Sequence, residues 1–232
     1  MKIKFFSILR TASAALVALG VAAIPAWAGP PLVCHAFDIG NAGSLPWVSH
    51  DWNLSGGERY DTRGLSKDTV AILDSSPVVL VHMETLRRAT LYARKDTESA
   101  KQLLLLLTAR GEASERSARP NALAIFDAGY LAETYKQWLG DGAQNPAKGT
   151  DGYALVEKAL RLDPNDAQME FAAALIALRF PAAERREHAK KAMAGAQNDE
   201  LLARNLNSRF LAGPETMQAM IAQDSDAKVA KQ

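Results

Sequence analysis

The chain has 232 residues, 48% of them hydrophobic, and its 27 basic side chains almost balance its 26 acidic ones. It lacks the basic excess that is typical of nucleic-acid-binding proteins, so we expect no nucleic acid partner. The single cysteine, Cys34, excludes an intramolecular disulfide, and a hydrophobic core must therefore hold the fold together.

Residues 1–28 have the three parts of a secretory signal peptide. A basic start is followed by an apolar run over residues 12–24 and by the small-x-small sequence Ala26-Trp27-Ala28. The run is shorter than the roughly 20 residues that a membrane-spanning helix needs. We therefore expect cleavage after Ala28, export of the mature chain to the periplasm or the medium, and no membrane span after cleavage.

Residues 29–75 are expected to form an irregular leader, because they are rich in Gly, Pro, Ser, Asp and Asn and lack a sustained period. Their large apolar side chains are too many for a disordered linker. These are Leu32, Val33, Phe37, Ile39, Leu45, Trp47, Val48, Trp52 and Leu54. Without a period of their own they must pack on another surface. We predict that residues 29–54 dock on the stripe formed by Val79, Met83 and Leu86.

Residues 76–223 predict helices almost without interruption, and residues 224–232 form a polar tail. Caps and apolar stripes place helices at about 76–93, 96–111, 120–140, 151–162 and 166–181, around Ala189 and Met193, and at about 198–213. In this interpretation Asp96 caps a helix start, while Gly111 and Gly140 end helices. The sequence thus predicts an all-α fold with an irregular docked leader.

Residues 152–166 resemble the second helix and exit turn of a tetratricopeptide repeat. In that family a small residue stands five positions before a proline, as Ala159 stands before Pro164. The small residue lets neighbouring helices approach, and the proline fixes the turn into the next repeat. Gly129 is a candidate small residue in the preceding helix. The resemblance implies antiparallel helix pairs stacked as a short array; a generic antiparallel helical domain is the alternative.

The leader also contains the candidate binding residues. Cys-His pairs can bind a metal or hold a reactive thiolate, but adjacent side chains in an extended segment point to opposite sides. A buried small side chain beside a polar one is the plainer interpretation of Cys34 and His35. No metal-binding spacing is present, so we expect neither a metal nor another cofactor. The ligand-binding candidates are Cys34, His35, Asp38, Trp47, His50 and Trp52.

The first predicted helix contains further polar residues. His82 and Met83 are conceivable copper ligands, although Met83 fits the apolar stripe and is interpreted as core. Glu84, Arg87 and Arg88 have the spacing of a solvated helix face, with Glu84 and Arg88 as an i,i+4 pair.

Two functions from different classes fit these observations. The first is a non-enzymatic interaction module that binds a protein or peptide partner, because stacked helix pairs create a binding groove. The second is a small-ligand or metal-binding protein, with or without enzymatic activity, that uses the leader residues. No motif in the chain indicates a reaction. Residues 30–41 also resemble the start of exported bacterial proteins of unknown function, which implies no activity.

Overall fold

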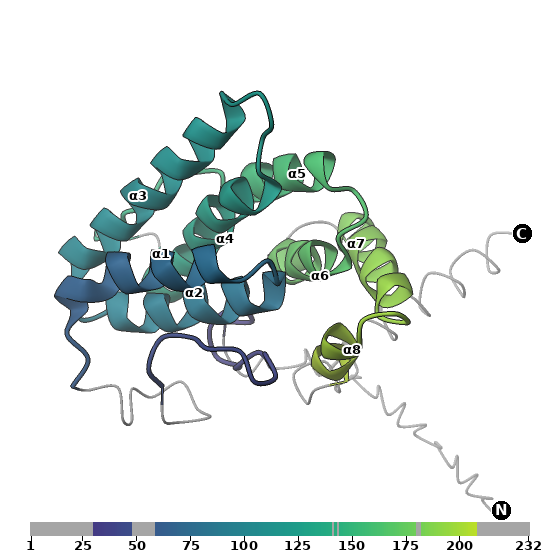
Figure 1. The fold of residues 1–232 in the computed structure, drawn as a ribbon, viewed down its shortest axis with the longest axis horizontal. Helices are drawn as coiled ribbons and strands as arrows, with labels where there is room; N and C mark the ends of the chain where they lie inside the picture. Colours follow the sequence, from purple (N-terminus) through teal and green to yellow (C-terminus); the bar gives the residue numbers. More distant parts are fainter. Residues whose placement is uncertain (1–29, 48–58, 141, 143, 180–181, 208–232) are drawn as a thin grey trace, which may run out of the picture.

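The computed structural model describes residues 30–47, 59–140, 142, 144–179 and 182–207. Within these ranges the chain is all-helical and has no strand, and Figure 1 shows the arrangement. The helices are α1 (Leu65–Ser75), α2 (Val79–Ala93), α3 (Thr97–Glu115), α4 (Ala122–Leu139), α5 (Gly152–Leu162), α6 (Ala167–Ile176), α7 (Ala182–Gly195) and α8 (Glu200–Leu206), with 3-10 turns η1 (Thr62–Gly64) and η2 (Ala177–Arg179). No helix in the described ranges is long and apolar enough to cross a membrane.

Five of these helices begin at a side chain that accepts a hydrogen bond from a main-chain amide of the first turn. These N-caps are Asp96, Asn121, Asp151, Asp166 and Asp199. Such a cap satisfies an amide that the helix itself leaves unpaired. The prediction that Asp96 starts a helix is therefore confirmed, and Gly140, with φ of 66°, ends α4 as expected.

Two boundaries differ from the expectation. Residues 65–75 were predicted to belong to an irregular leader, but they form α1, whose Leu65, Thr69 and Leu73 recur every four residues and are buried. Gly111 does not end a helix; it lies inside α3, which continues to Glu115. A Cβ at Gly111 would lie 3.3 Å from the main-chain oxygen of Ala124 in α4, so the glycine serves close packing instead.

The helices pack largely in chain order, as Figure 1 shows: α3 contacts α4, α4 contacts α5, and α6 contacts α7. Helix α2 packs against both α1 and α4, and all of its residues except Arg88 are buried. Ala159, the small residue of the repeat-like segment, is fully buried in α5. The fold is thus a set of stacked helix pairs around one core.

The leader is docked on this body over residues 30–47. Leu32, Val33, Phe37 and Leu45 are buried in the same core as the helices. Trp47 is partly buried and packs edge-on against Tyr92 of α2, with ring centroids 5.8 Å apart. Docking on the helical body is confirmed for these residues. Their hydrogen bonds with α2 involve Glu84, Thr85, Arg87, Arg88 and Tyr92, so docking on the stripe of Val79, Met83 and Leu86 stays a prediction. Residues 48–54, together with the predicted signal peptide and polar tail, lie outside the described ranges.

Candidate functional site

The candidate site is the face of the helical body on which the leader lies. Its centre is a charged cluster on α2. The Glu84 carboxylate accepts hydrogen bonds from Arg87, at 2.7 Å and 3.0 Å, and from Arg88 at 2.7 Å. The side chains of Glu84 and Arg87 are 0% exposed. The expectation of a solvated face is therefore wrong, because the leader covers this side of α2.

The buried cluster binds the main chain of the leader. Phe37 donates its amide to Glu84 Oε2 at 3.0 Å, and Arg87 donates Nη1 to the Val33 carbonyl at 2.9 Å. Arg88 donates to the Leu45 carbonyl at 2.6 Å. A buried ion pair is tolerated only when its remaining hydrogen-bonding capacity is satisfied. Here the leader's main chain satisfies it.

Helix α8 holds the leader at a second place. Asp38 donates its amide to Asn205 Oδ1 at 2.9 Å, and Asn205 Nδ2 donates to the Asp38 carbonyl at 2.8 Å. The Asp38 carboxylate is bonded to Arg204 Nε at 2.7 Å. The hydrogen bonds from Arg204 and from the Gly40 amide lower the pKa of Asp38. One residue of the leader is thus bound through its amide, its carbonyl and its side chain.

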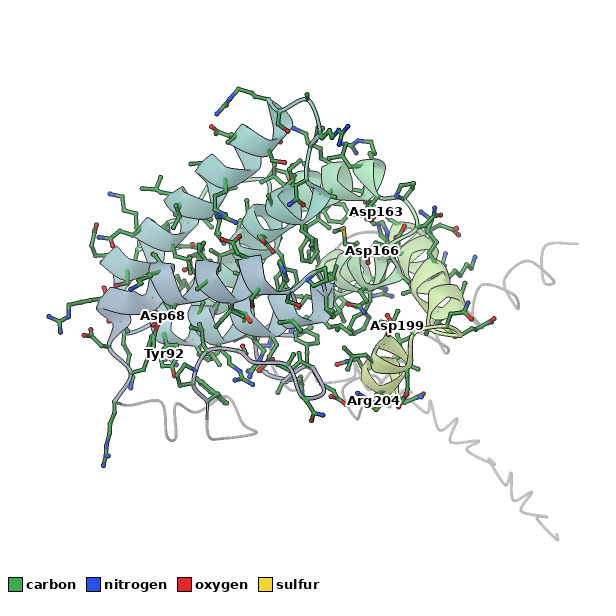
Figure 2. All side chains as sticks on the ribbon, in the orientation of Figure 1. Asp68, Tyr92, Asp163, Asp166, Asp199 and Arg204 are labelled. Carbon is green, nitrogen blue, oxygen red and sulfur yellow. The ribbon has the colours of Figure 1, made fainter. Side chains whose placement is uncertain are left out.

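The remaining contacts come from α4, α6 and the rest of α2. Gln137 of α4 accepts the Leu32 amide at 2.9 Å. Phe171 of α6 meets the Phe37 ring at a right angle, with centroids 6.1 Å apart. Tyr92 donates its hydroxyl to the Pro46 carbonyl. Tyr92 and Arg204, labelled in Figure 2, lie far apart along the same side of the body.

The predicted binding residues are therefore spread along this face. Cys34 and His35 are half-buried near Arg87, Asp38 is held by α8, and Trp47 lies on Tyr92. Burial raises the pKa of the Cys34 thiol, although the charge of Arg87 opposes this, so the thiol does not become a thiolate readily. Burial and the Arg87 charge both lower the pKa of His35.

His50 and Trp52 lie outside the described residues. Among the residues that the structure describes, no group of His, Cys, Asp or Glu side chains is arranged to hold a metal ion.

The sequence interpretation missed Gln137 and Asn205 entirely. Both are amides within helices, where such a residue usually faces water, and nothing local distinguishes them. Asn205 is nevertheless buried, and its side chain also donates to the Leu201 carbonyl of its own helix. The one available signal was the position of Asn205, a polar residue among the apolar positions of α8.

A second polar group lies at the junction of α1, α2 and α4. His82 Nε2 donates to the Ser76 carbonyl at 2.8 Å, and Nδ1 is 2.7 Å from Asp127 Oδ1. Burial lowers the pKa of His82, but the hydrogen bond and charge of Asp127 outweigh it and the net shift is upward. Both side chains border a cleft of about 310 Å³, and the Arg110–Asp74 ion pair lies on the same cleft.

A third polar group joins α5, α6 and α7. Tyr153 donates its hydroxyl to Glu184 at 2.9 Å, and the same oxygen lies 2.8 Å from His188 Nε2. His188 Nδ1 is bonded to the buried Glu170, which also accepts from Lys191 at 2.7 Å. Burial raises the pKa of Glu170, but the hydrogen bonds from His188 and Lys191 outweigh this effect, and the net shift is downward. The group ties three helices together.

Comparison with protein-family models, with curated proteins and with solved structures gave no match.

Proposed function

We propose that this chain is an exported, non-enzymatic interaction module, built as a short tetratricopeptide-like array, that binds a segment of a partner polypeptide. The pairing of α4 with α5 and of α6 with α7 supports the array. So does the buried Ala159, five residues before Pro164 in the turn to α6. The basic start and the Ala26-Trp27-Ala28 sequence support export.

One observation carries the proposal: the helical body already binds a stretch of polypeptide through its main chain. The contacts described above come from α2, α4, α6 and α8, which are alternate helices of the chain. In an array of helix pairs, alternate helices line one common face. Side chains of α2, α4 and α8 bind amides and carbonyls of residues 32–46, and α6 contributes the Phe171 ring. A peptide-binding face must combine contacts of these two kinds.

A selection of displayed peptides against the purified mature chain tests this function. Enriched peptides are then made with a photo-crosslinking group, and the crosslinked residues are mapped by mass spectrometry. The proposal expects crosslinks on α2, α4, α6 and α8, and none with scrambled peptides of the same composition. If no peptide is enriched, or if crosslinks fall on α3, α5 and α7, the proposed face is not a binding site.

A small-ligand role is the second candidate, and the cleft beside His82 and Asp127 favours it. The cleft is polar, and its Arg110 side chain is 35% exposed. Thermal-shift screening with small amines, carboxylates and phosphates tests this role. A ligand that raises the melting temperature of the wild type but not of an Arg110→Gln variant would support it. No shift with any of these compounds would count against it.

A further inference from the structure

The leader is held at two separate places on the face. Residues 32–38 contact α2, α4, α6 and α8, and residues 44–47 contact α2 alone in the interactions described above. Residues 40–43, between them, are exposed. The second place includes a hydrogen bond of 3.0 Å between the Ser44 and Thr85 hydroxyls. The two binding regions of the leader are thus joined by residues that bury little surface against the helical body.

Recognition at the first place has a general part and a specific part. The general part is main-chain binding, through Gln137, Glu84, Arg87 and Asn205, which any sequence with the same backbone path satisfies. The specific part is side-chain burial. Leu32, Val33 and Phe37 are buried, and Asp38 pairs with Arg204. Together they define a pattern of two adjacent aliphatic residues, three further residues, and then Phe-Asp.

We propose that residues 30–47 are an intramolecular ligand of this face, and that the partner is a polypeptide segment with the same pattern, which displaces the leader. The inference rests on the proposed function and adds the partner's sequence class and its competition with the leader.

The buried ion pair explains why the partner must offer free main chain. If the leader left, Glu84 would lose the Phe37 amide and Arg87 would lose the Val33 carbonyl. A buried charged group left without its partner is costly. An incoming segment with an amide and a carbonyl at these positions replaces both bonds. A folded surface, whose main chain is already paired, does not.

We expect displacement of the leader to begin at its contact with α8. The Asp38–Arg204 pair is about half exposed, with side chains 45% and 44% accessible, and only Ile39 separates Asp38 from the exposed residues 40–43. Exposed ion pairs contribute little to stability, so at this end the leader is held mainly by the two hydrogen bonds between Asp38 and Asn205. The cis leader has an effective concentration in the millimolar range. A competing segment can bind only the molecules whose leader has left the face. Its apparent affinity is therefore reduced in proportion to the small fraction of molecules in that open state.

The test uses the full mature chain and a fluorescent peptide of residues 30–47. Phe37→Ala and Asp38→Ala each remove a contact of the leader with the face. Phe126→Leu is the control, because Phe126 is a core residue that takes part in none of the leader interactions described above. We expect the peptide to bind Phe37→Ala at least about tenfold more tightly than the wild type, and Asp38→Ala about two- to fivefold more tightly, since the open fraction rises with the stability that each substitution removes from the leader. It should also raise their melting temperatures.

Two control peptides and a second leader variant make the outcome decisive. A scrambled peptide, and a peptide that itself carries Phe37→Ala, should bind at least about tenfold more weakly. If Phe37→Ala fails to fold, Asp38→Ala carries the test, because it removes only a half-exposed ion pair and the exposed hydrogen bond from the Gly40 amide. Peptide binding that is absent from both leader variants, or equal on wild type, leader variants and Phe126→Leu, overturns the inference.

The proposed function fails separately. If displayed peptides crosslink to α2, α4, α6 and α8 while the peptide of residues 30–47 binds no leader variant, the interaction module stands and the displacement inference does not.

Discussion

Gly129 of α4 and Gly152 of α5 lie directly against each other where these helices cross. A Cβ atom placed on Gly129 would lie 2.6 Å from the Gly152 carbonyl oxygen, and one on Gly152 would lie 2.5 Å from the Gly129 carbonyl oxygen. Both obstacles are main chain, which cannot rotate aside as a side chain can. The pair therefore sets the distance between the two helices, and through it the position of α5 in the stack.

Replacing either glycine with alanine should destabilise the fold. Overpacking of this kind costs about 1–3 kcal/mol, and more where the backbone must move. Chemical denaturation of Gly129→Ala and Gly152→Ala measures the change in the free energy of unfolding. Gly142→Ala is the control, because a Cβ there meets nothing within 4 Å. Unchanged stability of both variants would mean that α4 and α5 do not cross at these residues.

Breaking the charged cluster under the leader should cost more. Glu84→Gln leaves Arg87 without its carboxylate in a site with no solvent exposure. Removing one partner of a buried ion pair costs about 3–5 kcal/mol. The matched control is Glu112→Gln, which breaks an ion pair with Arg116 in which both side chains are mostly exposed, worth about 0–1 kcal/mol. Equal losses in the two variants would place Glu84 in solvent.

The fold of the helical body could be predicted from the sequence because its signals are local. Caps such as Asp96, stops such as Gly140 and stripes such as Leu103 and Leu107 act within a few residues of chain. Helix α1 was missed because no side chain caps its start and because its buried residues, Leu65, Thr69 and Leu73, include only two apolar side chains.

The candidate site could be predicted only in part. The apolar side chains of the leader predict that it docks. They do not predict where it docks, because its position depends on contacts between residues as far apart in sequence as Asp38 and Asn205. The spacing of Glu84 and Arg88 is the same for a solvated and for a buried helix face. Only the tertiary position of the leader decides between the two, and no local pattern reports it.

Stability should fall at alkaline pH through His82. Its pKa is raised in the folded state, mainly because the Asp127 carboxylate outweighs the effect of burial. A histidine with a raised folded pKa stabilises the fold fully below its unfolded pKa, and this contribution is lost as the pH rises through the folded pKa. Burial also raises the pKa of Asp127, which acts in the same direction.

The measurement is the free energy of unfolding of wild type and His82→Gln between about pH 5 and pH 9, a window around the ordinary histidine pKa. The difference between the two proteins should shrink as the pH rises. A constant difference would show that His82 holds no extra proton in the folded protein.

Removing the leader should destabilise the body. A chain that begins at Arg59 keeps every helix of the described residues but lacks the buried Leu32, Val33, Phe37 and Leu45. Each large apolar side chain is worth about 1.5–3 kcal/mol when fully buried, so the loss should exceed any single substitution discussed here. Thermal denaturation compares this chain with one that begins at Gly29. Equal melting temperatures would mean that the leader contributes nothing to the fold.

The central claim, that the leader's main chain is bound by the helical face, is tested most directly by hydrogen exchange at the Phe37 amide. This amide donates to the fully buried Glu84, whereas the exposed Asn41, four residues later, provides an internal reference. Protection of a buried amide requires large-scale opening before exchange. In a chain that begins at Gly29 we predict that the Phe37 amide exchanges orders of magnitude more slowly than the Asn41 amide. Exchange of both amides at the rate of an unstructured peptide would contradict the account.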